Sequence, residues 1–298
     1  MKVQVSDVGP RDGLQNEAAV LEPAVRAELC DRLAASGLAR IEAASFVNPK
    51  LVPQMAGAEE VFASLERKQG VVYSGLVLNE RGYDRALAAG VDEVHYGFAV
   101  TDSFGQRNQN QTTEQGLELC HRLVARARAD RLPITVTLMV SFGCPFEGRV
   151  EPERVLRLAE RILESPPDEL LFADTIGVGV PAQARRMVGG ALELGAAAVG
   201  LHLHNTRNTG YANALAGLEA GATVLDASVG GAGGCPFAPR ATGNIATEDL
   251  VYLLHGMGYE TGISLERLIE CSRWLSERLG KELPGMVAKA GGFAAVAD

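Results

Sequence analysis

Short apolar runs alternate with longer amphipathic stretches along almost the whole chain. The apolar runs have the length and composition of buried strands, and the amphipathic stretches repeat their apolar positions at helical spacing. Eight runs predict strands: Val3–Val8, Arg40–Ser45, Val71–Leu78, Glu93–Ala99, Ile134–Val140, Leu170–Ala173, Val199–His204 and Thr223–Ser228. The stretches after them predict helices: Ala24–Ala35, Glu59–Lys68, Glu80–Ala89, Thr113–Ala129, Pro152–Leu163, Ala182–Leu194, Ala212–Ala220 and Thr247–Met257.

This alternation predicts a parallel sheet covered by helices. A doubly wound open sheet usually has about five or six strands, so the larger number favours an α/β fold of the TIM (β/α)8 barrel type. Ser264–Leu279 remains as an additional C-terminal helix, and Gly230–Asn244 as a glycine-rich lid loop after the last strand. Because no linker, low-complexity tract or repeat divides the sequence, residues 1–298 are expected to form a single domain.

The composition narrows the class of protein. The chain is 47% hydrophobic and 22% charged, as in globular proteins, and its formal net charge of −9 argues against a nucleic-acid partner. No apolar run approaches the roughly 20 residues of a membrane-spanning helix, and the first strand begins too early to leave room for a signal peptide. The five cysteines are scattered and form neither a disulfide framework nor a Cys-x-x-Cys site, so we expect a reducing, cytoplasmic environment.

Polar residues that could take part in catalysis or metal binding gather where the predicted strands end. They are Arg11, Asp12, Glu42, Asp174, His202, His204, Cys235 and Asn244. Enzymes with a TIM barrel place their active sites at the C-terminal ends of the strands. We therefore expect these side chains to surround one site.

The two histidines of His202-Leu203-His204 point to the same side of a strand. Asp12 is expected near them, because the first and last strands are neighbours in a closed barrel, and Asn244 offers an amide oxygen. Such a set of oxygen and imidazole ligands suits six-coordinate Mg²⁺ or Mn²⁺ better than tetrahedral zinc. The alternative is a hydrogen-bonded pair of histidines without an ion.

Other residues of this group have two interpretations each. Arg11 could face a developing oxyanion from its Pro-Arg-Asp-Gly turn, or form a surface ion pair with its neighbour. Glu42 and Asp174 could accept hydrogen bonds from backbone amides, and Asp174 could instead orient Arg11 or a metal ligand. Cys235 lies in a loop that is poorly suited to bury it, so we interpret it as a group that transfers a proton. Cys144 is interpreted as structural or as lining the substrate pocket.

Two segments resemble signatures of the hydroxymethylglutaryl-CoA lyase family: Gly9–Glu17 (GPRDGLQNE) and Ala232–Asp249 (AGGCPFAPRATGNIATED). The segments IEAASFVNPK, GCPFEG and ADTIGVGVP are similar to others in family order, so the likeness spans nearly the whole chain. The resemblance implies a carbon–carbon lyase that uses Mg²⁺ or Mn²⁺, acts on an acyl-CoA thioester and forms a homodimer.

The resemblance also implies roles for individual residues. The metal ligands would be Asp12, His202, His204 and Asn244. Arg11 would stabilise an enolate oxygen and Cys235 would transfer a proton, with support from Glu42, Asp174 and Glu248. The implied reaction is retro-Claisen cleavage of 3-hydroxy-3-methylglutaryl-CoA to acetyl-CoA and acetoacetate, in which the metal lowers the pKa of the substrate hydroxyl. His202 and Asp12 are both candidates for the base that removes its proton.

Departures from the family pattern leave the acyl group open. They are Ala18 in place of a lysine, Asn205 in place of an aspartate, Arg207 in an altered run, and Arg240 in place of a glycine. One alternative is the same chemistry on another 3-hydroxyacyl-CoA, such as a longer or branched 3-substituted glutaryl-CoA. Another is a catalytically silent barrel that binds an acyl-CoA or a metal. The presence of every ligand together with Cys235 argues against the silent barrel.

Overall fold

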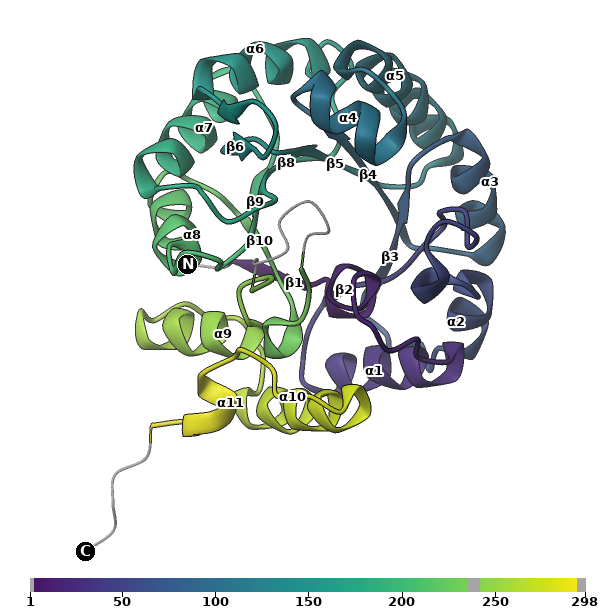
Figure 1. Ribbon diagram of the computed structural model, residues 1–298, viewed down its shortest axis with the longest axis vertical. Helices are drawn as coiled ribbons and strands as arrows, with labels where there is room; N and C mark the ends of the chain where they lie inside the picture. Colours follow the sequence, from purple (N-terminus) through teal and green to yellow (C-terminus); the bar gives the residue numbers. More distant parts are fainter. Residues whose placement is uncertain (1–2, 235–241, 294–298) are drawn as a thin grey trace, which may run out of the picture.

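The computed structural model describes residues 3–234 and 242–293. Eight parallel strands close into a barrel in the order β1-β10-β9-β8-β5-β4-β3-β2, and helices surround them as a ring (Figure 1). The barrel strands are β1 (Gln4–Asp7), β2 (Arg40–Ser45), β3 (Val72–Val77), β4 (Glu93–Ala99), β5 (Ile134–Met139), β8 (Glu169–Asp174), β9 (Val199–Leu203) and β10 (Val224–Ala227). The predicted TIM barrel is confirmed, with strand ends that differ by a residue or so.

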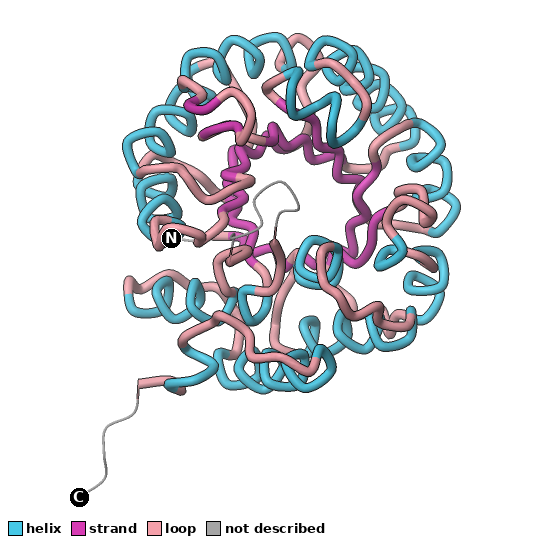
Figure 2. Tube along the Cα trace, viewed as in Figure 1, coloured by secondary structure: helices cyan, strands magenta, loops and turns pink. Residues whose placement is uncertain are grey.

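The tube in Figure 2 shows the helices outside the ring of strands. They are α1 (Pro23–Ala35), α2 (Ala58–Ser64), α3 (Glu80–Ala89), α5 (Thr113–Asp130), α6 (Pro152–Ile162), α7 (Pro181–Glu193), α8 (Gly210–Glu219) and α9 (Thr247–Gly256). The predicted C-terminal helix is α10 (Leu265–Leu279), which packs on α1 and α9. Helix α2 ends before the predicted Lys68 because Leu65 is extended and the amide of Glu66 is bound by the Asp31 carboxylate.

Several short elements were not predicted. They are the π-helix η1 (Gly9–Gly13), the 3₁₀ turns η2 (Pro53–Met55) and η3 (Val229–Gly231), the helices α4 (Asp102–Gln109) and α11 (Val287–Ala290), and the hairpin of β6 (Gly143–Cys144) and β7 (Gly148–Arg149). All but α11 lie in loops that follow barrel strands. They are too short or too polar to show an apolar period in the sequence. Together they shape the mouth of the barrel.

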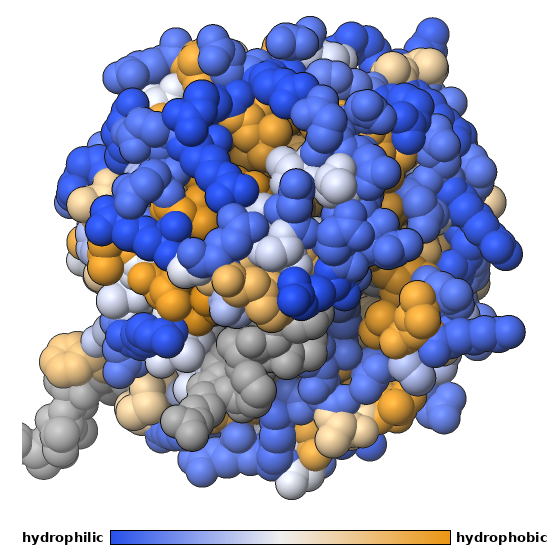
Figure 3. All heavy atoms as spheres, turned by 45° about the horizontal axis from the view of Figure 1, so that its top comes forward, coloured by the Kyte–Doolittle hydropathy of each residue, from blue (hydrophilic) through white to orange (hydrophobic). Residues whose placement is uncertain are grey.

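The surface and the cysteines agree with the sequence-based picture. The face shown in Figure 3 is largely hydrophilic, with small apolar patches between charged residues. Within residues 3–234 and 242–293, no helix combines the length and the apolar character needed to cross a membrane. The described cysteines, Cys30, Cys120, Cys144 and Cys271, are buried and free.

A buried ion cluster fills the barrel near the N-terminal ends of its strands. Arg40 of β2 pairs with Glu93 of β4 and Glu169 of β8, and it also donates to the Thr135 hydroxyl at 2.7 Å. Since alternate residues of a strand point inward, these residues form one layer across the barrel. This layer closes the barrel interior at the N-terminal ends of the strands and leaves it open at their C-terminal ends.

Replacing Arg40 with Met should leave two carboxylates of this cluster without their cation. Removing one partner of a buried ion pair costs about 3–5 kcal/mol, and we expect a loss of that size in the free energy of unfolding, measured by urea denaturation. The matched control is Arg149→Met, whose partner Glu151 is exposed like Arg149 itself. That change should cost less than about 0.5 kcal/mol. Equal losses in the two variants would contradict the role given to Arg40.

Candidate active site

The turn η1 follows β1 and carries Arg11 and Asp12 at the mouth of the barrel. Single π-helical turns occur frequently at functional sites. Both glycines of η1 lie against their neighbours. A Cβ at Gly9 would come within 2.7 Å of a carboxylate oxygen of Asp7, and one at Gly13 within 2.6 Å of the Ser228 hydroxyl. Close packing on β1 and on the end of β10 therefore fixes the turn and its two charged side chains.

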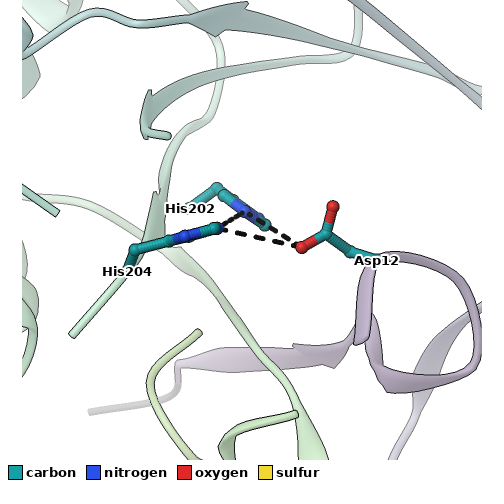
Figure 4. A group of neighbouring side chains, drawn as sticks. All are labelled: Asp12, His202 and His204. Atoms are coloured by element: carbon teal, nitrogen blue, oxygen red, sulfur yellow. Dashed lines mark hydrogen bonds and ion pairs between the residues drawn. The ribbon is translucent and has the colours of Figure 1, made fainter. Parts of the chain in front are cut away.

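Asp12, His202 and His204 point toward one another at the mouth (Figure 4). The Nε2 atoms of the two histidines are 3.3 Å apart, and each lies 3.8 Å from Oδ2 of Asp12. One cation placed between these atoms could contact all three, since the three candidate ligand atoms lie within 4.8 Å of one another. The structure thus brings together three of the four residues predicted as metal ligands.

Asn244 is the fourth predicted ligand, and it lies beside the other three. Its amide nitrogen donates to Oδ2 of Asp12 at 2.8 Å and to the Ala232 carbonyl at 3.1 Å. Its amide oxygen is buried and has no hydrogen-bond partner among the described residues, which is costly for a polar atom. A flip of the amide would exchange oxygen and nitrogen and aim the oxygen at the cluster. The resulting set of metal ligands, which is two imidazoles, a carboxylate oxygen and an amide oxygen, fits a hard divalent cation.

Asp226 of β10 is a site residue that the sequence analysis missed. Its Oδ2 lies 3.3 Å from Nδ1 of His202, on the side of the ring away from the cluster. A carboxylate in this position holds the ring so that Nε2 faces a metal. The sequence placed Asp226 on a predicted strand, but only the register of β10 and β9 shows that it pairs with His202.

The charges of the cluster favour metal binding near neutral pH. Burial alone would raise the pKa of Asp12, but Arg11 and the two histidines outweigh it and hold that pKa well below its usual range. Burial, with the neighbouring His202, lowers the pKa of His204 to about 4, so His204 is neutral. Burial would also lower the pKa of His202, yet its bond to Asp226 and the charge of Asp12 raise it. Because a metal binds the neutral imidazole, a cation at this cluster competes with protonation of His202.

Arg11 is held between two carboxylates. One guanidinium nitrogen lies 2.6 Å from Asp12, and Nε donates to Glu42. The other oxygen of Glu42 lies 2.6 Å from Nδ1 of His95, and Nε2 of His95 lies 2.6 Å from the Thr137 hydroxyl. Glu42 thus contacts side chains and not backbone amides. Burial opposes its charge, but Arg11 and His95 outweigh burial and lower the pKa of Glu42 to about 2. His95 was also missed.

Asp174 and Glu248 lie behind the mouth. Asp174 accepts hydrogen bonds from the amides of Val178 at 2.9 Å and Gly179 at 2.8 Å. Glu248 accepts one from the amide of Gly230 at 2.9 Å. Asp174 thus accepts hydrogen bonds from backbone amides, as one of its two interpretations had it. Its described hydrogen bonds include none to Arg11 or to a metal ligand. Both carboxylates hold loops in place, and a catalytic role for either stays a prediction.

Three of the four departures that left the acyl group open have separate outcomes. Asn205 accepts a hydrogen bond from the amide of Gly210 at 3.2 Å, at the start of α8. Arg207 donates to the carbonyls of Ile176 at 3.3 Å and Gly177 at 2.9 Å. Asn205 and Arg207 therefore brace neighbouring loops, and neither lines the cavity described next. The third residue, Arg240, lies with Cys235 and most of the predicted lid loop outside the described residues.

A cavity of about 170 Å³ lies beside the metal-ligand cluster inside the barrel mouth. Polar residues on its wall are Arg11, Asp12, Gln15, Asn16, His95, Asn108, Thr137, Thr175, His202 and His204. The remainder of the wall is mostly apolar and comes from β3, β4, β5, β8, α4, the loops after β2 and β3, and Gly234. Small-molecule sites commonly combine such an apolar wall with a few polar groups.

Fold and site together define a TIM-barrel protein with a metal-ligand cluster at the C-terminal ends of its strands. Comparison with protein families gives the family. The model described as HMGL-like matches residues 2–275, and the chain belongs to this family. The resemblance found in the sequence is thereby confirmed.

Individual relatives are similar over nearly their whole length. The (R)-citramalyl-CoA lyase of Chloroflexus aurantiacus is 48% identical over 300 residues, which cover 97% of this chain and 95% of that protein. The hydroxymethylglutaryl-CoA lyase YngG of Bacillus subtilis is 39% identical, with 95% of each chain covered. A solved structure of an HMG-CoA lyase from Acinetobacter baumannii, in complex with coenzyme A and 3-methylmalate, has a TM-score of 0.94 at 37% identity and covers 100% of this chain and 97% of its own.

Replacing Asp226 with Asn should weaken metal binding, because the amide holds the His202 ring less firmly than a carboxylate. Loss of such a partner typically lowers metal affinity about 10- to 100-fold, and we expect a loss of that size for Mn²⁺ in calorimetric titration without substrate. Asp84→Asn, which changes an exposed surface carboxylate, is the matched control and should leave the affinity unchanged. An unchanged affinity in the Asp226 variant would contradict this role.

Glu248 should make folding stability depend on pH. Burial raises the pKa of this carboxyl from its ordinary 4.5 to about 7, so the folded state binds its proton more tightly than the unfolded state. Its contribution is complete below pH 4.5 and is lost as the pH rises through 7. Between pH 5 and 8 the wild type should lose on the order of 2–3 kcal/mol relative to Glu248→Gln, which cannot titrate there. Parallel stability curves from urea unfolding would contradict the shift.

Proposed function

We propose that this protein is a divalent-metal-dependent acyl-CoA lyase that cleaves a carboxylated 3-hydroxy-3-methylacyl-CoA by a retro-Claisen reaction. The observation that carries the proposal is the cluster of Asp12, His202 and His204, which lines one cavity together with Arg11 in a chain of the HMGL-like family. A cavity with a divalent-cation site and a fixed guanidinium offers two positively charged groups to a substrate that becomes an enolate.

The residues have distinct roles in this reaction. Asp12, His202, His204 and Asn244 would hold Mg²⁺ or Mn²⁺, which when bound lowers the pKa of the substrate hydroxyl. Loss of the hydroxyl proton turns the carbinol carbon into a carbonyl and breaks the adjacent carbon–carbon bond. The bonding electrons pass to the acetyl-CoA fragment as an enolate.

Arg11 stabilises the enolate oxygen, and Glu42 holds the guanidinium in place for this task. A proton on the enolate carbon then completes acetyl-CoA, and we assign that transfer to Cys235. His202 and Asp12 are both kept as candidates for the base that accepts the hydroxyl proton.

For the acyl group, (R)-citramalyl-CoA is our first candidate and 3-hydroxy-3-methylglutaryl-CoA the second. The first would give pyruvate and acetyl-CoA, the second acetoacetate and acetyl-CoA. Identity of 48% to a citramalyl-CoA lyase, against 39% to the lyase YngG, supports this order. A related structure is a complex with coenzyme A and 3-methylmalate, an isomer of citramalate, which supports a diacid of this size as the acyl group. The sequence alone favoured the second substrate, with longer acyl groups as alternatives.

The test is to incubate the protein with Mg²⁺ and each thioester in turn, and to measure acetyl-CoA and the keto acid by chromatography. We expect citramalyl-CoA to have at least about tenfold higher kcat/KM, because one methylene in a fitted pocket is worth roughly 1–3 kcal/mol. The reverse preference would restore 3-hydroxy-3-methylglutaryl-CoA as the substrate. If neither thioester is cleaved, or if cleavage persists in excess EDTA, the proposal is wrong. The homodimer and the cytoplasmic location implied earlier stay predictions.

A further inference from the structure

The innermost part of the active-site cavity has a polar floor that none of the roles above uses. His95 and Thr137 both line the cavity, and they lie one inward-facing position deeper in their strands than Gly97 and Met139. Below them the interior is closed by the ion cluster around Arg40. A group that enters from the mouth and passes the metal-ligand cluster therefore meets the His95 imidazole and the Thr137 hydroxyl.

His95 is held rigidly from behind. Its Nδ1 lies 2.6 Å from Glu42, a buried carboxylate that can only accept, so the ring proton on that side is fixed. Its Nε2 lies 2.6 Å from the Thr137 hydroxyl: a bare Nε2 accepts the hydroxyl proton, whereas a protonated Nε2 donates to the hydroxyl oxygen and leaves the hydroxyl proton free for a ligand. Glu42 is bound by Arg11 as well, which offsets its charge. With a proton on Nε2, the pair of His95 and Thr137 thus offers one polar hydrogen atom, that of the Thr137 hydroxyl, at the cavity floor.

Gly97 leaves the space above this floor open. It lies in a strand with ordinary backbone angles, and a Cβ added there would come no closer than 3.6 Å to its nearest neighbour, the Thr137 carbonyl oxygen. Neither the backbone nor the packing requires glycine at this position. The one effect of the missing side chain is therefore to widen the cavity directly above the His95 imidazole.

Charge and size indicate which group belongs there. A coenzyme A moiety is far larger than a cavity of about 170 Å³, so it must stay outside while the acyl end points inward. Among the described residues of the cavity wall, Arg11 is the one permanent cation and Asp12 the one carboxylate. An acyl carboxylate that reaches past the cation site and Arg11 meets His95 and Thr137 at the cavity floor.

We propose that His95 and Thr137 form the subsite for the distal carboxylate of the acyl group, and that the bulk of His95 sets the acyl length. This inference rests on the proposed function, because it takes the ligand to be an acyl-CoA thioester. It adds which residues bind that carboxylate and which residue limits the length of the acyl chain.

The test uses coenzyme A thioesters that lack the 3-hydroxyl and so cannot be cleaved. Succinyl-CoA carries a carboxylate, butyryl-CoA has the same chain length without one, and glutaryl-CoA is one methylene longer than succinyl-CoA. Their dissociation constants are measured by calorimetry with Mg²⁺ present. A charged hydrogen bond contributes about 1.5–3 kcal/mol, so wild type should bind succinyl-CoA at least about tenfold more tightly than butyryl-CoA.

Two variants remove the polar floor in different ways. His95→Phe keeps the bulk of the side chain but removes its nitrogens. Thr137→Val leaves the hydrogen bond between His95 and Glu42 intact, so it provides the test if the first variant does not fold. Each should reduce the advantage of succinyl-CoA to about twofold or less, while the affinity for butyryl-CoA stays within about threefold. The matched control is His255→Phe, which removes an exposed histidine bonded to Thr261 at 2.8 Å and should change neither constant.

A third variant tests the length. In His95→Ala, the ratio of the affinity for glutaryl-CoA to that for succinyl-CoA should be about fourfold higher than in wild type. The reason is that one buried methylene contributes about 0.8 kcal/mol. The inference is overturned if His95→Phe and Thr137→Val weaken succinyl-CoA and butyryl-CoA equally, or leave their ratio unchanged. If no thioester binds, the proposed function fails and this inference with it. If carboxylate selectivity is present but neither hydroxyacyl-CoA is cleaved, only the proposed function fails.

Discussion

The site depends on one buried guanidinium, that of Arg11, which lies between the carboxylates of Asp12 and Glu42. Burying a carboxylate without a partner is strongly unfavourable, and the group would take up a proton instead. Arg11 keeps both groups ionised, so that Asp12 is ready to bind a cation and Glu42 is ready to hold His95. One residue on a tight turn therefore links the metal-ligand cluster to the floor of the cavity.

The barrel explains why these groups stay in place. Strands β9 and β10 supply His202 and its supporting Asp226 from paired inward positions. Strands β4 and β5 supply His95 and Thr137 from inward positions that are offset by two residues, since Thr137 pairs with Gly97. Hydrogen bonds between the strands fix these positions before any ligand arrives, which lowers the cost of ordering the site. The loops at the mouth are then braced by Asp174, Glu248 and Arg207, whose hydrogen bonds go to backbone atoms.

The sequence predicted the elements with a strong period and the residues that share one strand. The barrel followed from the number of alternating strands and helices, and His202 and His204 followed from their two-residue spacing. The π-turn η1, helix α4 and the hairpin of β6 and β7 could not be predicted, because short polar segments carry no apolar period.

Partners on different strands were harder to predict. Asp226 and His95 both lie on predicted strands, but the contacts that give them a role depend on which residues of neighbouring strands stand opposite one another. This register is a property of the closed barrel and cannot be read from a single strand. The contacts of Asp174, Asn205 and Arg207 depend on loop conformation in the same way.

The most direct measurement of the central claim is a crystal structure of the protein grown with Mn²⁺, with data collected for the anomalous signal of manganese. The account predicts a single strong anomalous peak at bonding distance from Oδ2 of Asp12 and from Nε2 of His202 and His204, with the oxygen of Asn244 turned toward it. A peak at another place in the barrel, or none at this cluster at saturating Mn²⁺, would contradict the account.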